Sequence, residues 1–240
     1  MSRERIGVSF VSVAAVLLFA AAPAAAQPFE LSVRKDRVFG ASQGSLVFAS
    51  DSVMFQTPDS KEAREWVYDD IKQVQILSST HVRLATYEDR GWTRLGADRT
   101  VDFEVTGEPV SEALVVFLQT RVPHPLVTAV VPAVDADPLF RVPVKLRQRI
   151  HGSHGMLEVW GDRIVYRTPR DEHSRLWRLA DLYLVFQPDR HRLTVQAYEG
   201  GGDQTRAFEF DLKRSLPPGA LEAIWDGMHG SSADRVGRPD

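Results

Sequence analysis

The stretch Gly44–Asp59 reads GSLVFASDSVMFQTPD, and a related stretch, GMLEVWGDRIVYRTPR, follows at Gly155–Arg170. In both, two runs of alternating apolar residues flank a short turn, Ser50-Asp51 or Gly161-Asp162. Such alternation predicts half-buried strands. A Thr-Pro pair ends the second run, because proline cannot donate to a strand ladder. We therefore predict the same β-hairpin twice.

The similarity extends well beyond the hairpin. Without gaps, Gly44–Glu88 and Gly155–Glu199 share 11 identical residues in 45 columns, whereas about three would be expected by chance. With a four-residue deletion, the alternation of Val101, Phe103 and Val105 continues opposite Phe208, Phe210 and Leu212. The chain is therefore an internal duplication, and such repeats define the architecture before any other signal.

Each copy is predicted to consist of strands closed by one helix. We expect Trp66–Leu77 and Trp177–Phe186 each to form one strand with a kink. Pro109 is predicted to start the first helix, and Pro217-Pro218 the second, because proline is tolerated at a first helical position. Gly227 and Gly230 are expected to end the second helix.

These signals divide the chain into five segments. They are a signal peptide (1–26), a first domain (27–122), a Pro-rich linker (123–138), a second domain (139–230) and a disordered tail (231–240). Four prolines make the linker a semi-rigid spacer, in which Leu126–Val131 is able to pair as an edge strand.

The first 26 residues indicate export. A short basic start precedes the apolar run Ile6–Ala22, and small residues lead to a cleavage site after Ala26, which is the order of a secretory signal. The rival interpretation, a transmembrane anchor, requires a longer apolar run. We expect a periplasmic or secreted protein without a later transmembrane span.

Composition excludes several classes of function. The absence of cysteine rules out disulfides and thiol catalysis. Without the signal, 27 basic and 31 acidic residues remain, so the chain lacks the general charge signature of nucleic-acid binding. We find no G-x-S-x-G, H-E-x-x-H or phosphate-binding glycine loop. We therefore expect no enzyme activity and no cofactor.

The G-x-L-x-[FV]-x-x-D-x-[VI]-x-[FY] hairpin, the W-x-x-x-D-[IL]-x-x-V segment and the closing helix together resemble the pleckstrin-homology-like (PH-like) fold. Trp225 occupies the place of a helical tryptophan found in many such domains, whereas the first copy has Leu118 there. The resemblance implies a mainly β protein of two tandem PH-like domains, each an antiparallel barrel or sandwich of about seven strands capped by a C-terminal helix. Lipocalin-like and other small β-barrels are the rival folds. PH-like families bind phospholipid headgroups, peptides or proteins, and the fold does not decide between them.

Basic residues of the second copy form one candidate ligand site. Lys145, Arg147 and Arg149 alternate on a predicted strand and so project from one face, and Arg163 and Arg167 share a face of the following hairpin. Guanidinium groups suit phosphate or carboxylate. An ordinary charged surface is the alternative interpretation.

His151 and His154 form the second candidate site. Two histidines three positions apart could contribute to a metal site, with Glu158 or Asp162 as a third ligand. The alternative is a solvated glycine-rich turn, since the first copy has Gly40 and Gln43 at the matching positions. We interpret this turn as structural.

The sequence favours an exported, non-catalytic binding or scaffold module. Its expected partner is a protein or peptide of the cell envelope, bound at a sheet edge or beside a helix. The alternatives are a binder of anionic phosphate or lipid headgroups and a metal protein or enzyme centred on the histidine turn. The copies differ at Ala49/Trp160 and Gln56/Arg167, so we expect the second copy to carry any site.

Overall fold

The structure is a computed structural model that describes residues 27–36, 40–89, 98–148, 152–170, 172–199 and 204–236. The predicted signal peptide lies outside these residues. The first repeat contains β1 (Phe29–Asp36), β2 (Ala41–Phe48), β3 (Ser52–Gln56), β4 (Arg64–Val67), the 3-10 turn η1 (Tyr68–Asp70), β5 (Ile71–Ser78), β6 (His81–Asp89), β7 (Asp98–Val105) and α1 (Glu112–Arg121).

The second repeat has the same order of elements. It contains β9 (Phe140–Leu146), β10 (Ser153–Val159), β11 (Arg163–Arg167), β12 (Arg175–Arg178), the 3-10 turn η3 (Leu179–Asp181), β13 (Leu182–Asp189), β14 (Arg192–Ala197), β15 (Arg206–Leu212) and α2 (Ala220–Val236). One further strand, β8 (Leu126–Thr128), lies between the repeats.

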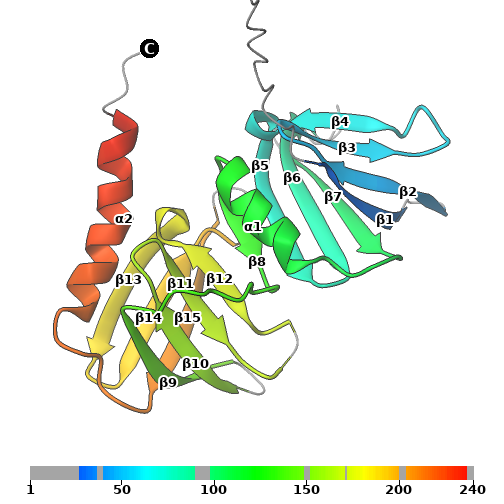
Figure 1. Cartoon of the computed structure of the whole chain (residues 1–240). Coiled ribbons are helices and arrows are strands. Elements are labelled where there is room, and N and C mark those ends of the chain that lie inside the picture. The colour runs from blue at the N-terminus through cyan, green and yellow to red at the C-terminus, as the bar shows by residue number, and fades with distance from the viewer. Residues whose placement is uncertain are drawn as a thin grey trace, which may run out of the picture.

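Among the described residues, each repeat forms an open run of seven antiparallel strands followed by a helix (Figure 1). The strand order is β5-β6-β7-β1-β2-β3-β4 in the first repeat and β13-β14-β15-β9-β10-β11-β12 in the second. Each repeat has its own apolar core. The predicted fold class, mainly β with two PH-like repeats, is confirmed by this architecture.

The repeated glycine of the hairpin is required by close packing. A Cβ atom on Gly44 would lie 2.1 Å from the carbonyl oxygen of Gln56, and one on Gly155 would lie 2.2 Å from that of Arg167. Both glycines cross over the aromatic ring of the facing strand, Phe55 or Tyr166. The identical Gly columns of the alignment therefore mark places where the backbones of two strands approach closely.

The predicted kinked strand after each tryptophan is wrong. A full 3-10 turn, η1 or η3, separates β4 from β5 and β12 from β13. The two strands joined by the turn stand at opposite ends of the strand order in their repeat, so the chain must cross from one end to the other there. The tryptophan indole anchors the crossing: Trp66 donates to Glu88 at 3.2 Å, and Trp177 donates to Glu199 at 2.7 Å.

The linker is packed against both repeats, so the expectation of a spacer is corrected. Its strand β8 pairs in parallel with β5 and, through Thr128, with Leu176 of β12. It therefore lies inside a sheet of 15 described strands and not at an edge. Beyond it, Val131 and Val134 pack on a small cluster of Trp160, Val165 and Leu176. Leu126–Thr128 is buried because both neighbouring strands cover it.

Neither helix begins at its predicted proline. The second helix, α2, starts at Ala220, two residues after Pro218, and the first, α1, starts at Glu112, three residues after Pro109. Ser111 is its N-cap, and its side chain accepts a hydrogen bond from the backbone N–H of Leu114 at 3.2 Å. A serine in this position satisfies an N–H group that has no partner within the helix.

The second helix does not end at its glycines; it passes through Gly227 and Gly230 and continues to Val236. Gly227 is needed for packing, since a Cβ there would lie 2.3 Å from Cδ1 of Leu179 and 2.7 Å from the carbonyl oxygen of Gly161. Packing thus overrides the low helix propensity of glycine. Neither described helix is long and apolar enough to cross a membrane. Residues 237–240 of the predicted tail lie outside the described residues.

Candidate binding surface

Lys145 and Arg147 lie exposed on the outer face of the second repeat. Lys145 of β9 stands opposite Asp211 of β15 on one side and His154 of β10 on the other. Arg147 forms an ion pair with Glu209 at 3.5 Å. This face therefore carries charges of both signs. Arg149 lies outside the described residues.

Arg163 is held at the contact between the repeats. Its Nε and Nη2 atoms donate to the two carboxylate oxygens of Asp162 at 2.9 and 2.5 Å, and Nη1 donates to the side-chain oxygen of Gln119 at the end of α1 at 2.9 Å. The hydrogen bond from Arg163 lowers the pKa of Asp162, and the same contact raises the pKa of Arg163. Arg163 thus ties the hairpin turn of the second repeat to the first repeat.

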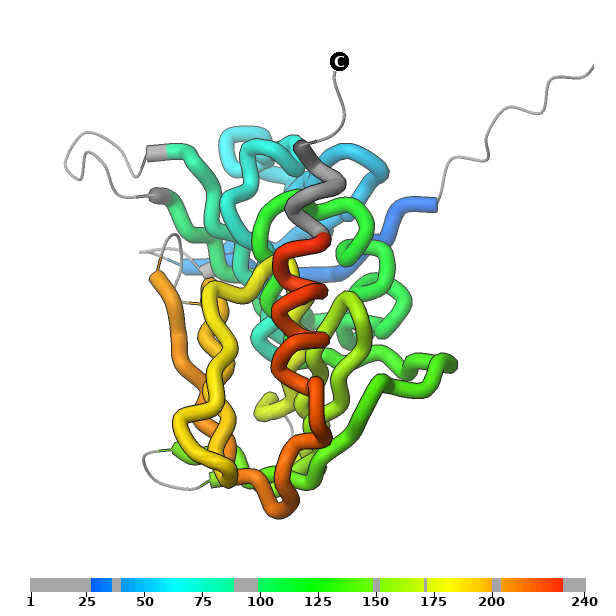
Figure 2. The backbone as a smooth tube through the Cα atoms, turned by 90° about the vertical axis from the view of Figure 1, so that its left-hand side faces the viewer, coloured from blue at the N-terminus to red at the C-terminus, as the bar shows by residue number. Residues whose placement is uncertain are grey.

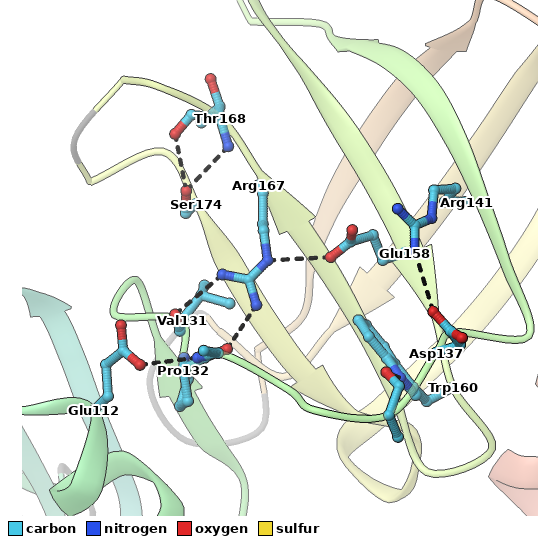
Figure 3. A network of polar contacts seen from close by, with 12 residues as sticks. Glu112, Val131, Pro132, Asp137, Arg141, Glu158, Trp160, Arg167, Thr168 and Ser174 are labelled. Carbon is cyan, nitrogen blue, oxygen red and sulfur yellow. Dashed lines mark hydrogen bonds and ion pairs between the residues drawn. The ribbon is translucent and has the colours of Figure 1, made fainter.

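Arg167 holds the linker (Figure 3). Its guanidinium donates to the carbonyl oxygens of Val131 at 3.2 Å and Pro132 at 2.6 Å, and its Nε donates to Glu158 at 3.1 Å. Trp160, at the other copy-specific position, donates its indole N–H to the carbonyl of Ala136 at 3.1 Å. The structure thus places the predicted pair Lys145 and Arg147 beside carboxylates. It places Arg163 and Arg167 in contacts that hold the second repeat to the first repeat and to the linker, a region that we call the joint.

His154 lies exposed on β10, directly opposite Lys145, and His151 lies outside the described residues. Within the described part of the chain, no three His, Asp or Glu side chains gather closely enough to hold a metal ion. The neighbouring ammonium group of Lys145 disfavours a cation at His154 by like-charge repulsion.

A cavity of about 570 Å³ lies where α1, the Gly161-Asp162 turn, η3 and α2 meet. Arg178 lines it and already uses all five of its N–H groups. They donate to both carboxylate oxygens of Asp181 and to the carbonyls of Gln119, Val122 and His124. Guanidinium has no sixth donor, so this arginine serves as a clamp between the repeats.

A cluster of exposed apolar side chains runs along the free edge of the second repeat, at β13 and α2. We call it the apolar edge: Tyr183, Leu184, Phe186 and Trp225, exposed by 56%, 40%, 38% and 42%. They are four of the eight large apolar side chains found exposed among the described residues. Figure 2 looks onto this edge, where α2, in orange to red, runs beside the yellow strand. Exposed apolar side chains on two adjoining elements indicate an interaction surface.

The equivalent strand of the first repeat, β5, is covered. Leu184 and Phe186 correspond to Gln73 and Gln75 in the 111-residue register, and both glutamines are buried. The side-chain N–H of Gln75 donates to the side-chain oxygen of Gln73, and the side-chain N–H of Gln73 donates to the backbone carbonyl of Tyr198 in the second repeat. The covered copy of this face is thus polar, whereas the uncovered copy is apolar.

Trp225 connects α2 to the edge strand. Its indole N–H donates to the backbone carbonyl of Val185 at 2.8 Å. On the same strand, the ring of Tyr183 packs edge-on against Tyr198, with centroids 5.9 Å apart. At this edge a backbone carbonyl of β13 therefore lies on a strand with exposed apolar side chains, and exposed strand edges of this kind are surfaces that extended peptides bind.

Sequence reasoning missed this surface although the alignment contained a signal for it. The columns Gln73/Leu184 and Gln75/Phe186 exchange buried amides for exposed apolar groups. Apolar residues in a strand are ordinarily assigned to the core. Only the strand order shows that β13 has no neighbour on one side in the described sheet.

Comparison with known proteins identifies no relative by sequence: no protein-family model matches the chain, and no curated protein does. Weak likenesses to solved structures exist. The complex of PDZ-RhoGEF DH/PH domains with activated RhoA matches with a TM-score of 0.31 and 13% identity over 39% of this chain and 30% of that one.

The DH/PH domains of p115-RhoGEF give a TM-score of 0.28 and 12% identity, over 54% of this chain and 36% of that one. The Spt16D–Pob3N heterodimer gives 0.31 and 10%, over 80% of this chain and 98% of that one. The chain thus spans about a third of the length of the RhoGEF structures that it matches. TM-scores this low assign neither a family nor a partner.

Proposed function

We propose that this chain is an exported, non-catalytic binding module that holds a protein or peptide of the cell envelope at its apolar edge. The observation that carries the proposal is the exchange of buried glutamines on β5 for exposed apolar residues on β13. Strand β13 forms as β5 does, but its outward side chains are exposed. The fold itself does not require leucine and phenylalanine at these exposed positions. A partner that covers them supplies a need for these residues.

The composition of the apolar edge supports a protein partner. Tyrosine, tryptophan and phenylalanine are enriched where binding energy concentrates in protein interfaces, and three of the four edge residues are of these types. Truncating a residue of this kind at the centre of an interface typically costs about 2 kcal/mol or more. Two or three such contacts are enough for a specific complex of moderate affinity.

The N-terminal sequence supports the exported location. Its basic start, apolar run and small residues before Gln27 have the order of a cleaved secretory signal. The missing catalytic motifs support a binding role. Binding of anionic headgroups receives no specific support from the described residues, because Lys145 and Arg147 stand beside carboxylates and Arg163 and Arg167 bind the joint.

Site-specific photo-crosslinking in the native envelope tests the proposal. A photoreactive amino acid at position 186 should capture one recurrent partner protein, and the same substitution at position 116, on the exposed side of α1, should not. Val116 is a matched control because it is 50% exposed and lies in the other repeat. Capture of no protein at position 186, or the same set of proteins at both positions, would refute the proposal.

A further inference from the structure

The linker strand β8 shows how this fold accepts an added strand. It runs parallel to β5, with Val74, Gln75 and Ile76 paired to Leu126, Val127 and Thr128. The next backbone N–H, that of Ala129, donates to the carbonyl of Ile76 at 2.8 Å. Three residues of extended chain therefore cover this edge in the first repeat.

In the second repeat the corresponding edge belongs to β13, and a side chain contacts it in place of a strand. Val185 corresponds to Val74 in the 111-residue register, and its carbonyl accepts the indole N–H of Trp225. The first repeat has Leu118 at the position of Trp225, and leucine has no N–H to offer. The tryptophan thus occupies a backbone position that corresponds to the one paired by a strand in the first repeat.

The geometry points to Trp225 as a displaceable cap: we propose that the partner adds to β13 as a short parallel strand and removes the indole from the carbonyl of Val185. This inference rests on the proposed function. The strand would pair with residues 185–187, the equivalents of Val74–Ile76, and would end before Pro188. The equivalent residue of the first repeat is Leu77, one position beyond its paired stretch.

The chemistry of β8 indicates the chemistry of the partner segment. Leu126 and Val127 carry no charge and are almost fully buried between the flanking strands. The exposed apolar side chains of Leu184 and Phe186 on β13 offer a matching environment. We infer an extended, uncharged segment rich in aliphatic and β-branched residues. Trp225 as a permanent guard against edge-to-edge aggregation is the competing explanation, because exposed edges are commonly blocked in this way.

A peptide of the chain's own linker, residues 123–132 with blocked ends, is the probe. Its binding to the full chain is measured by fluorescence anisotropy for the wild type, Trp225→Phe and Trp160→Phe. Losing one competing hydrogen bond should make Trp225→Phe bind about three- to tenfold more tightly. Trp160→Phe is the matched control, since it removes an indole N–H that bonds the carbonyl of Ala136 and no group of β13, and its affinity should equal that of the wild type.

Indole ¹⁵N–¹H spectra of the wild type supply a readout that needs no destabilising variant. The Trp225 signal, assigned by its loss in Trp225→Phe, should shift and exchange faster with water when the peptide binds. If the wild type and Trp225→Phe bind the peptide with equal affinity, or if the Trp225 signal does not move when the peptide is bound, the proposal that the peptide displaces the indole is wrong. A peptide that binds none of the variants would refute strand addition. The proposed function would survive either result, because it depends on the crosslinking at position 186.

Discussion

Arg178 and Asp181 form a two-pronged ion pair at the contact between the repeats, with N–O distances of 2.6 and 2.9 Å. Asp181 also accepts the backbone N–H of Leu126 at 3.1 Å, where β8 begins. The first repeat has Val67 at the position of Arg178 and an exposed Asp70 at that of Asp181. The duplicated aspartate was therefore recruited to the joint in one copy only.

Removing this arginine should destabilise the whole chain. In Arg178→Ala, the carboxylate of Asp181 and three backbone carbonyls lose their donor, and breaking a pair this buried costs about 3–5 kcal/mol. Urea unfolding measures the loss. Arg141→Ala is the control: its pair with Asp137, at 3.8 Å, is largely exposed, so its loss should cost less than about 1 kcal/mol. Similar costs for the two variants would contradict the clamp.

Two glycines of α2 should respond to alanine in opposite directions. Gly230 has open space around its Cβ position, so Gly230→Ala should stabilise the chain by about 0.5–1 kcal/mol through helix propensity. Gly227→Ala brings the same gain but forces its Cβ against Leu179 and the carbonyl of Gly161, so we expect a net loss of about 1 kcal/mol or more. Thermal unfolding of both variants measures these changes. Stabilisation by Gly227→Ala would show that α2 does not need the close approach of Gly227 to Leu179 and Gly161.

Glu199 should make a contribution to stability that falls as the pH rises, whereas a carboxyl group with a lowered pKa makes one that grows. Burial raises the pKa of this carboxyl, against the opposing charge of Arg175. A group whose pKa is higher in the folded than in the unfolded chain keeps its proton more tightly when folded. Its contribution to stability is therefore greatest below the ordinary glutamate pKa of about 4.3 and declines as the pH rises through the folded-state pKa.

Glu199→Gln should remove that decline while keeping an oxygen for the indole of Trp177. The free energy of unfolding of the variant, compared with the wild type by urea titration at a series of pH values, should improve steadily as the pH rises from about 4. Glu88→Gln is the matched control, since the Glu88 side chain is 41% exposed against 3% for Glu199. If the difference in the free energy of unfolding between Glu199→Gln and the wild type does not change with pH, the pKa of Glu199 is not raised by folding.

The sequence allowed the repeated strands to be predicted because their signals are local. Alternation around the turns of Asp51 and Asp162, and the Thr-Pro stop, act within a few residues. The joint could not be predicted in this way. Leu126–Thr128 pairs with strands about 50 residues away on either side, and nothing within the segment distinguishes an inner strand from an edge strand. Propensity likewise misplaced the end of α2, because Gly227 is selected by a tertiary contact.

The candidate site depends on the same distinction between covered and uncovered strands. Arginines were a reasonable choice for a ligand site, yet Arg163 and Arg167 bond to Gln119 and to the linker carbonyls. The signal that does bear on binding is a difference between the copies at outward positions of one strand. It becomes interpretable only when the other copy shows what covers that strand.

Exchanging the edge residues for those of the covered copy should abolish binding without loss of folding. Leu184→Gln with Phe186→Gln places on β13 the amides that β5 carries, at positions where the present side chains are 40% and 38% exposed. Stability should change by less than about 1 kcal/mol, because surface substitutions away from packed or bonded groups have small effects.

Capture of the partner by the double variant should fall more than tenfold, since at least 1.4 kcal/mol of apolar contact is lost. Leu139→Gln, which alters an apolar side chain that is 62% exposed at the start of the second repeat, should leave capture unchanged. Capture is quantified with the photoreactive group at position 183, within the apolar edge but outside the exchanged pair. Undiminished capture by the double variant would mean that the outward face of β13 does not contact the partner.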